Sequence, residues 1–100
     1  MLIVLAKARL GAGALDSLKE PIAAMVAASN AEDGCMAYTF TTDVGDPSVL
    51  HIIEKWRDEA ALLAHFATPH MAAFQAALAG ADLTIIEAIK YHADDGAPVM

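Results

Sequence analysis

Residues 54–70, EKWRDEAALLAHFATPH, decide how we interpret this chain, because they combine the end of a strand with the starts of two helices. Asp58 is a favoured helix N-cap residue and precedes the apolar segment Glu59–Phe66. Thr68 followed by Pro69 is a second helix start, with threonine at the N-cap and proline at the first helical position. The stretch also holds the single tryptophan of the chain. It therefore predicts a strand, a short helix and a second helix in direct succession.

Patterns elsewhere in the chain predict three more strands and one long helix. Alternating residues rich in leucine and valine indicate a strand at the start, and apolar residues at helical spacing indicate the long helix. Ser17-Leu18-Lys19-Glu20 fits a capping box, so this helix starts either near residue 18, or near residue 14 with a kink at Pro21. The predicted elements are a strand at 1–10, a helix within 15–31, strands at 35–43 and 48–57, helices at 59–66 and 69–79, and a strand at 83–92.

This order of elements is the βαββαβ order of the ferredoxin-like fold, an α+β fold in which an antiparallel sheet carries helices on one face. The other sheet face keeps apolar residues such as Ile3 and Leu5, and an uncovered apolar face needs a partner. We therefore expect one domain over residues 1–100 with a flexible tail at 93–100. We also expect a homodimer in which two sheets pack face to face.

The composition excludes several classes of function. The net charge is −7 and the six basic residues are scattered, so the chain lacks the basic surface that nucleic acids require. The same acidic balance argues against binding to anionic membranes. One cysteine, Cys35, excludes an intramolecular disulfide. The apolar run Leu2–Ala6 is too short for a signal peptide or a membrane helix, so we expect a cytoplasmic protein.

Three side chains are candidates for proton transfer, namely His65, Tyr38 and His51. Histidine has an ordinary pKa close to neutral pH, and a buried tyrosine hydroxyl needs a hydrogen-bond partner. His51 lies in the middle of a predicted strand, and periodicity leaves open whether its face meets the core or a cavity. Glu54 shares a strand face with Trp56 and is either a base or an ion-pair partner of a nearby cation.

A metal site built from the histidines is disfavoured by their spacing. His51, His65 and His70 with Glu54 offer the right donor types. His65 and His70, however, are five residues apart with a proline between them, whereas four residues align two ligands on one helical turn. We therefore predict no metal ligands.

Several short motifs follow one another in a recognisable order. They are the opening strand LIVLAKARL, the turn Glu32-Asp33-Gly34-Cys35 with Tyr38 after it, Glu54-Lys55-Trp56, Ala64-His65-Phe66 and Thr68-Pro69-His70-Met71. With these motifs the chain resembles the antibiotic-biosynthesis monooxygenase family, and within it the quinol-monooxygenase-like members. The resemblance covers nearly all of residues 1–92.

The resemblance implies a dimeric α+β barrel that oxidises a quinol, phenol or similar electron-rich aromatic with dioxygen and without a cofactor. In such a reaction the substrate supplies the electrons, and the protein supplies an apolar cavity and one or two proton-handling groups. The implied wall residues are Trp56, Phe66 and Phe74, with Glu54 and His70 as further substrate contacts, and with His65, Tyr38 or His51 handling protons.

Two other functions are compatible with this fold. One is a non-catalytic, stress-associated dimer that binds a small molecule. The other is an isomerase of a small phosphorylated carbonyl compound, for which Lys7 is the candidate anion-binding group.

Overall fold

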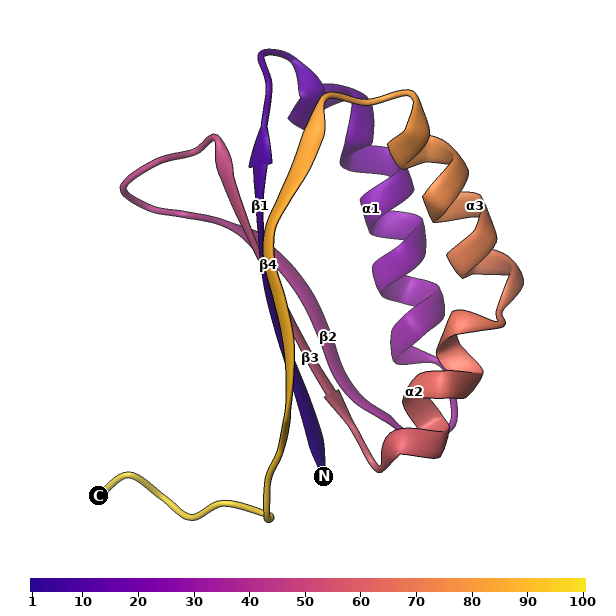
Figure 1. Cartoon of the computed structure of the whole chain (residues 1–100), viewed down its shortest axis with the longest axis vertical. Helices are drawn as coiled ribbons and strands as arrows, with labels where there is room; N and C mark the ends of the chain where they lie inside the picture. Colours follow the sequence, from indigo (N-terminus) through magenta and orange to yellow (C-terminus); the bar gives the residue numbers. More distant parts are fainter.

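The computed structural model describes all 100 residues and has the predicted α+β architecture, with a sheet on one side and the helices on the other (Figure 1). Every predicted element is present with bounds within one residue of the predicted range, and the structure decides between the two starts left open for the long helix. The elements are β1 (Leu2–Leu10), α1 (Ala14–Asn30), β2 (Cys35–Thr42), β3 (Val49–Trp56), α2 (Glu59–Phe66), α3 (Pro69–Ala79) and β4 (Leu83–His92).

The four strands form one antiparallel sheet in the order β2-β3-β1-β4. β1 is a central strand, and its residue Leu2 pairs with Trp56 of β3 on one side and with His92 of β4 on the other. The two ends of the chain's folded part therefore meet in the sheet, where the backbone N–H of Ala93 donates to the carbonyl of Met1. Residues beyond Ala93 form no helix or strand.

The register of β3 decides which of its faces meets the helices. Leu50, Glu54 and Trp56 are buried and point into the space between sheet and helices. Since side chains alternate along a strand, His51 lies on the opposite face. Burial thus shows that the face of β3 carrying His51 does not meet the core, a point that periodicity left open.

The core is centred on Trp56, whose side chain is 0% exposed. Around it pack Leu2 from β1, Met25 from α1, Tyr38 from β2 and Phe74 from α3. Every layer of the fold contributes to this cluster, so its residues fix the distance between sheet and helices. Full burial of one large aromatic side chain contributes about 3 kcal/mol.

The start of α1 differs from the capping-box prediction, which is wrong. The helix begins at Ala14, after Gly13 in a left-handed conformation, and no side chain caps it. The Ser17 hydroxyl instead donates to the carbonyl of Ala14. The alternative start near residue 14 is confirmed, and Pro21 lies inside the helix. Its missing N–H leaves the carbonyl four residues earlier without a helical hydrogen bond.

The two predicted helix starts after β3 are confirmed. The Asp58 carboxylate accepts a hydrogen bond from the backbone N–H of Ala61 at 2.9 Å. The Thr68 hydroxyl oxygen accepts one from the backbone N–H of Met71 at 3.2 Å. Each cap satisfies a backbone donor that the helix itself leaves unpaired, and so fixes where each helix begins.

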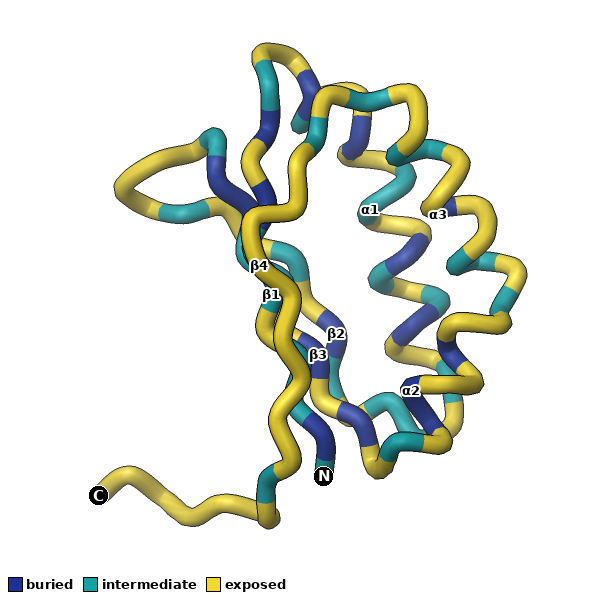
Figure 2. Tube along the Cα trace, in the orientation of Figure 1, coloured by how far each residue is buried: buried dark blue, intermediate teal, exposed yellow.

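The face of the sheet away from the helices is open, and β4 is exposed along almost its whole length (Figure 2). Leu5 of β1 pairs with Ile53 of β3 on this face, and their exposed fractions are 43% and 38%. Tyr91 of β4 adds a third large side chain, 47% exposed. The expected uncovered apolar face is present. None of the helices has the length and apolar character needed to span a bilayer.

Gly34, in the turn before β2, gives a test of the packing between this turn and α2. Its φ is +88°, and a Cβ there would lie 2.7 Å from the Cβ of Ala61. We expect Gly34→Ala to lower the free energy of unfolding by about 2–4 kcal/mol, from backbone strain and overpacking together. Gly13→Ala is the matched control, because Gly13 has φ +76° but open space around it. Its free energy of unfolding should fall by only about 1–2 kcal/mol, from backbone strain alone. Urea unfolding measures both, and equal losses would contradict the predicted clash.

Candidate functional site

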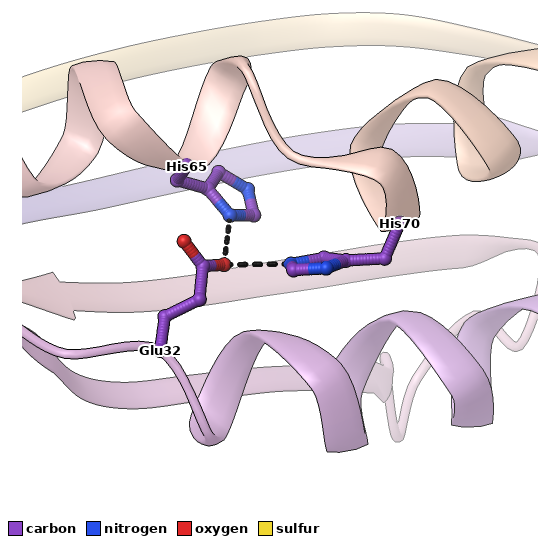
Figure 3. Close-up of side chains that lie close together, drawn as sticks. All are labelled: Glu32, His65 and His70. Carbon is purple, nitrogen blue, oxygen red and sulfur yellow. Dashed lines mark hydrogen bonds and ion pairs between the residues drawn. The ribbon is translucent and has the colours of Figure 1, made fainter.

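The carboxylate of Glu32 joins two histidines at the end of the helical layer (Figure 3). Glu32 lies in the turn after α1, His65 near the end of α2 and His70 near the start of α3. One oxygen, Oε2, lies 2.6 Å from Nδ1 of His65 and 2.7 Å from Nε2 of His70. Three groups from three separate elements thus meet at one carboxylate oxygen.

The break between α2 and α3 places the two histidines side by side. After α2 ends, the backbone N–H and the hydroxyl of Thr68 both donate to the carbonyl of His65. Thr68 then starts α3, and the rings of His65 and His70 come to 5.9 Å between centroids. The spacing of five residues argues against placing both histidines on one helical turn. In the structure they come from two different helices, α2 and α3.

The hydrogen bonds within the Glu32 cluster, which consists of Glu32, His65 and His70, determine which nitrogen of each imidazole carries the proton. A carboxylate only accepts, so Nδ1–H of His65 and Nε2–H of His70 are the donors. In a neutral His70 ring, Nδ1 then keeps its lone pair and can accept a proton. The arrangement resembles a carboxylate–imidazole pair in which the carboxylate orients a general base.

His65 is the buried member of the cluster and His70 the accessible one. The side chain of His65 is 1% exposed and packs against Trp56, with 4.7 Å between ring centroids, and against Tyr38, with 5.4 Å. His70 lines a cavity of about 250 Å³ between α1 and α3. His70 is therefore the group that a bound molecule can reach.

This cavity is apolar except at His70. It has no lysine, arginine or carboxylate in its wall, and Phe74 forms its aromatic side. The lining residues are Pro21, Ala24 and Met25 from α1, and His70, Ala73, Phe74 and Ala77 from α3. Alanines on both helices leave room for a small ligand beside the histidine.

Glu54 and Trp56 form a buried pair behind the histidines. Trp56 Nε1–H donates to Oε1 of Glu54 at 2.9 Å. Burial raises the pKa of the Glu54 carboxyl above its ordinary value, although the hydrogen bond from Trp56 opposes the rise. Neither side chain lines a cavity. We conclude that this pair supports the site from within the core.

Tyr38 is a poor base in this position. Burial, and after it the Glu54 carboxylate, raises the pKa of the Tyr38 phenol well above its ordinary value. The phenol therefore keeps its proton at neutral pH and is not available as a base.

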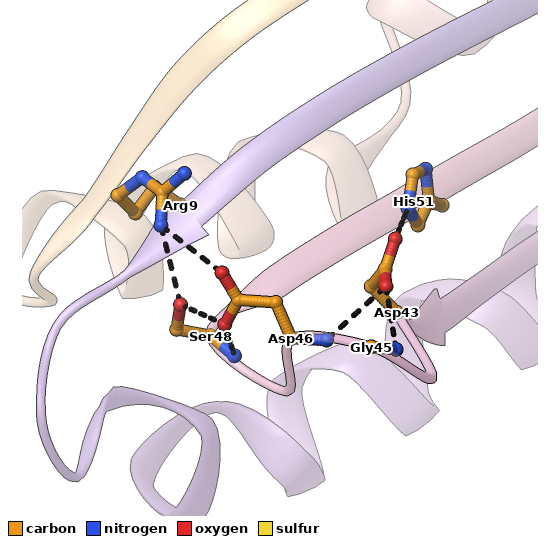
Figure 4. Close-up of polar contacts among 6 residues, drawn as sticks. All are labelled: Arg9, Asp43, Gly45, Asp46, Ser48 and His51. Atoms are coloured by element: carbon orange, nitrogen blue, oxygen red, sulfur yellow. Dashed lines mark hydrogen bonds and ion pairs between the residues drawn. The ribbon is translucent and has the colours of Figure 1, made fainter.

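Two other residues predicted for the site lie apart from the Glu32 cluster. Phe66 lines a separate cavity of about 330 Å³ that α2 forms with β1 and β4. His51 lies on the open sheet face, where Nε2 is 2.8 Å from the Asp43 carboxylate (Figure 4). The hydrogen bond from His51 is the main cause of a lowered pKa at Asp43. Asp43 belongs to the loop between β2 and β3, which also holds Asp46, the ion-pair partner of Arg9.

Sequence reasoning missed the role of Glu32, which it quoted only as part of a turn motif. The signal was its position directly after the first long helix, two residues before Gly34. Its partners lie more than thirty positions away along the chain, so only the three-dimensional structure brings them together.

A family model described as antibiotic biosynthesis monooxygenase matches residues 1–77 of the chain. This span contains the Glu32 cluster, Glu54, Trp56 and most of α3. None of the curated proteins compared with the chain matches it in sequence.

Solved structures share the fold over nearly the whole chain. A candidate antibiotic biosynthesis monooxygenase from Deinococcus radiodurans is 25% identical, with a TM-score of 0.90 over 100% of this chain and 99% of its own. A Pseudomonas aeruginosa protein is 31% identical, with a TM-score of 0.76 over 92% of this chain and 94% of its own. A Mycobacterium tuberculosis protein, 23% identical, reaches 0.82 over 97% and 98% of the two chains.

The buried carboxyl of Glu54 makes stability depend on pH. Its folded-state pKa is raised above the ordinary value of 4.5, so its contribution to stability is fully present below about pH 4.5 and is lost as the pH rises from there through the folded-state pKa. We expect Glu54→Gln to be more stable than the wild type at about pH 7.5, and this advantage to vanish below about pH 4.5. Urea unfolding at several pH values measures the difference.

The control is Glu20→Gln, the same chemical change on the exposed part of α1. It should leave the unfolding curve close to that of the wild type. An advantage of Glu54→Gln that stays constant from acidic to neutral pH would contradict the assigned cost of burial.

Proposed function

The chain belongs to the antibiotic biosynthesis monooxygenase family, and on that premise we propose that it is a cofactor-independent monooxygenase of a quinol, phenol or similar electron-rich aromatic. The observation that carries this proposal is the hydrogen bond between Glu32 and His70, because His70 also lines an apolar cavity. A base held at the wall of such a cavity is what removal of a phenolic proton requires.

His70 is the proposed proton acceptor. Its Nδ1 takes the proton of the substrate hydroxyl, while Nε2–H stays bonded to Glu32. The negative carboxylate stabilises the imidazolium that forms and holds the ring in place. His65 binds the same carboxylate oxygen from the buried side and so positions Glu32. In this proposal His65 and Tyr38 act through their neighbours and do not touch the substrate.

The aromatic anion then supplies the electrons for dioxygen. One electron passes from the anion to dioxygen, and the resulting radical pair combines to form a carbon–oxygen bond at the ring. The oxygen–oxygen bond then breaks, leaving one oxygen as a ring carbonyl and releasing the other as water. A phenol plus dioxygen thus gives a quinone plus water, which balances without a further reductant. The apolar lining favours these steps by excluding bulk water.

The cavity volume limits the size of the substrate. About 250 Å³ lies below the range of about 300–1,000 Å³ that holds drug-sized ligands. A substrate of one or two rings fits this space, with Phe74 as the aromatic wall. The isomerase alternative is disfavoured, since a phosphorylated compound needs a cation, and Lys7 lines a cavity on the open sheet face instead.

Oxygen consumption with a panel of reduced quinones and phenols tests this function. We expect His70→Gln and Glu32→Gln each to lower kcat by about 10²-fold or more, because the base or its orienting carboxylate is lost. His92→Gln, at the exposed end of β4, is the control and should keep the wild-type rate. If the wild type binds these compounds but consumes oxygen no faster than the uncatalysed reaction, the protein is a binding module and not an enzyme.

The second part of the proposal is that two copies of the chain associate through their open sheet faces. Leu5, Ile53 and Tyr91 are large and partly exposed on this face. Burying such a face in a two-fold dimer removes apolar surface that a lone chain leaves in water. A homodimer of this kind has the architecture of the dimeric α+β barrel that the family resemblance implies.

Ile53→Asp tests the association, because a carboxylate at this place is buried without a partner in a face-to-face dimer. We expect sedimentation velocity to show a dimer for the wild type and a monomer for Ile53→Asp. Leu63→Asp, on an exposed part of α2, is the control and should remain dimeric. A monomeric wild type, or equal dissociation in both variants, would count against the sheet-to-sheet interface.

A further inference from the structure

We propose that Glu32, His65 and His70 form a binding site for one divalent transition-metal ion of the Zn²⁺ class. The three ligand atoms, one from each side chain, lie within 4.8 Å of one another. Two imidazoles and one carboxylate are a donor set that suits zinc, cobalt and iron in their divalent states.

Small movements bring these ligands to metal-binding distances. Metal–nitrogen and metal–oxygen bonds of about 2.0–2.1 Å in a tetrahedral site place neighbouring ligand atoms about 3.4 Å apart. Oε2 of Glu32 lies 2.6 Å and 2.7 Å from the two ring nitrogens, so it must withdraw by about 0.7 Å, and the two ring nitrogens, which lie within 4.8 Å of each other, must approach to about 3.4 Å. Glu32 can do so, because it lies on a turn and its side chain is 13% exposed. The buried His65 ring stays in place, and the 23% exposed His70 side chain rotates toward it.

The electrostatic setting also favours a cation. The ion-pair partners of Glu32 are the two histidines alone, so no lysine or arginine competes for its carboxylate. The chain carries a net charge of −7. Three protein ligands leave a fourth position free, which water can fill because the cluster borders the cavity at His70.

The other histidine–carboxylate pair of the molecule provides a contrast. His51 and Asp43 lie 2.8 Å apart but belong to no group of three donors. Two partly exposed protein ligands bind such ions far more weakly than three convergent ones. His51→Gln is therefore a matched control, since it removes a histidine of the same kind without changing the cluster.

Metal binding has a consequence that rests on the proposed function. An ion held by Nε2 of His70 forces the ring proton onto Nδ1, which can then no longer accept a proton from the substrate. Occupancy by Zn²⁺ thus switches off the base, and the same three side chains serve either catalysis or metal binding.

Cobalt absorption spectroscopy on the full, metal-free chain tests the site without any substrate. We expect one Co²⁺ per chain, visible ligand-field bands and displacement of Co²⁺ by Zn²⁺. Glu32→Gln and His70→Gln should each raise the dissociation constant by about tenfold or more, and His51→Gln should leave it unchanged. These two variants carry the test because His65 is deeply buried, and near-UV circular dichroism of Trp56 verifies that they are folded.

The outcomes separate this site from the proposed function. Lack of cobalt bands in the wild type, or equal affinity in Glu32→Gln, His70→Gln and the wild type, would overturn the site. Cobalt binding that depends on Glu32 and His70 supports it, even if no quinol or phenol is oxidised. If the protein does oxidise such a compound, one equivalent of Zn²⁺ should abolish turnover, and full activity of the zinc-loaded protein would overturn the switch.

Discussion

Burial of the Trp56 indole is the constraint on which the rest of the molecule depends. The residue ends β3, pairs with Leu2 of β1 and is fully enclosed. Its N–H is satisfied by Glu54, and its ring packs against His65. Because His65 is held in this way, its Nδ1–H can hold Glu32, and Glu32 in turn holds His70 at the cavity. A continuous set of contacts thus runs from the centre of the core to the surface that a ligand can reach.

The elements of the fold follow from local chemistry, which is why the sequence predicts them well. Asp58, Thr68 and Pro69 mark two helix starts through caps that need no tertiary information. The start of α1 was harder to predict, because Ser17 and Glu20 imitate a capping box while the left-handed Gly13 lets the helix begin earlier. Local patterns alone do not show which of two possible starts the surrounding packing selects.

The candidate site was only partly predictable, because its members meet through the topology. His65, His70 and Trp56 were singled out by their type, and they do lie together. Glu32 was not, since nothing in the turn sequence says which helix ends will face it. His51 was singled out for the same reason as His65, yet the alternation of β3 places it on the other side of the sheet. Residue type identifies candidates, but the register and the helix break decide which of them form a site.

The pairing of β1 with β4 has a consequence for the order of folding. Leu2 pairs with His92, so the first strand of the chain is completed by the last. A ribosome must therefore make almost the entire chain before the central strand gains its second neighbour. Contacts this distant in sequence slow folding, because a large loop must close before they contribute stability. During synthesis β1 can pair only with β3, and its free edge is open to other chains until β4 arrives. The apolar strand β1 thus keeps one edge unpaired until β4 has been made.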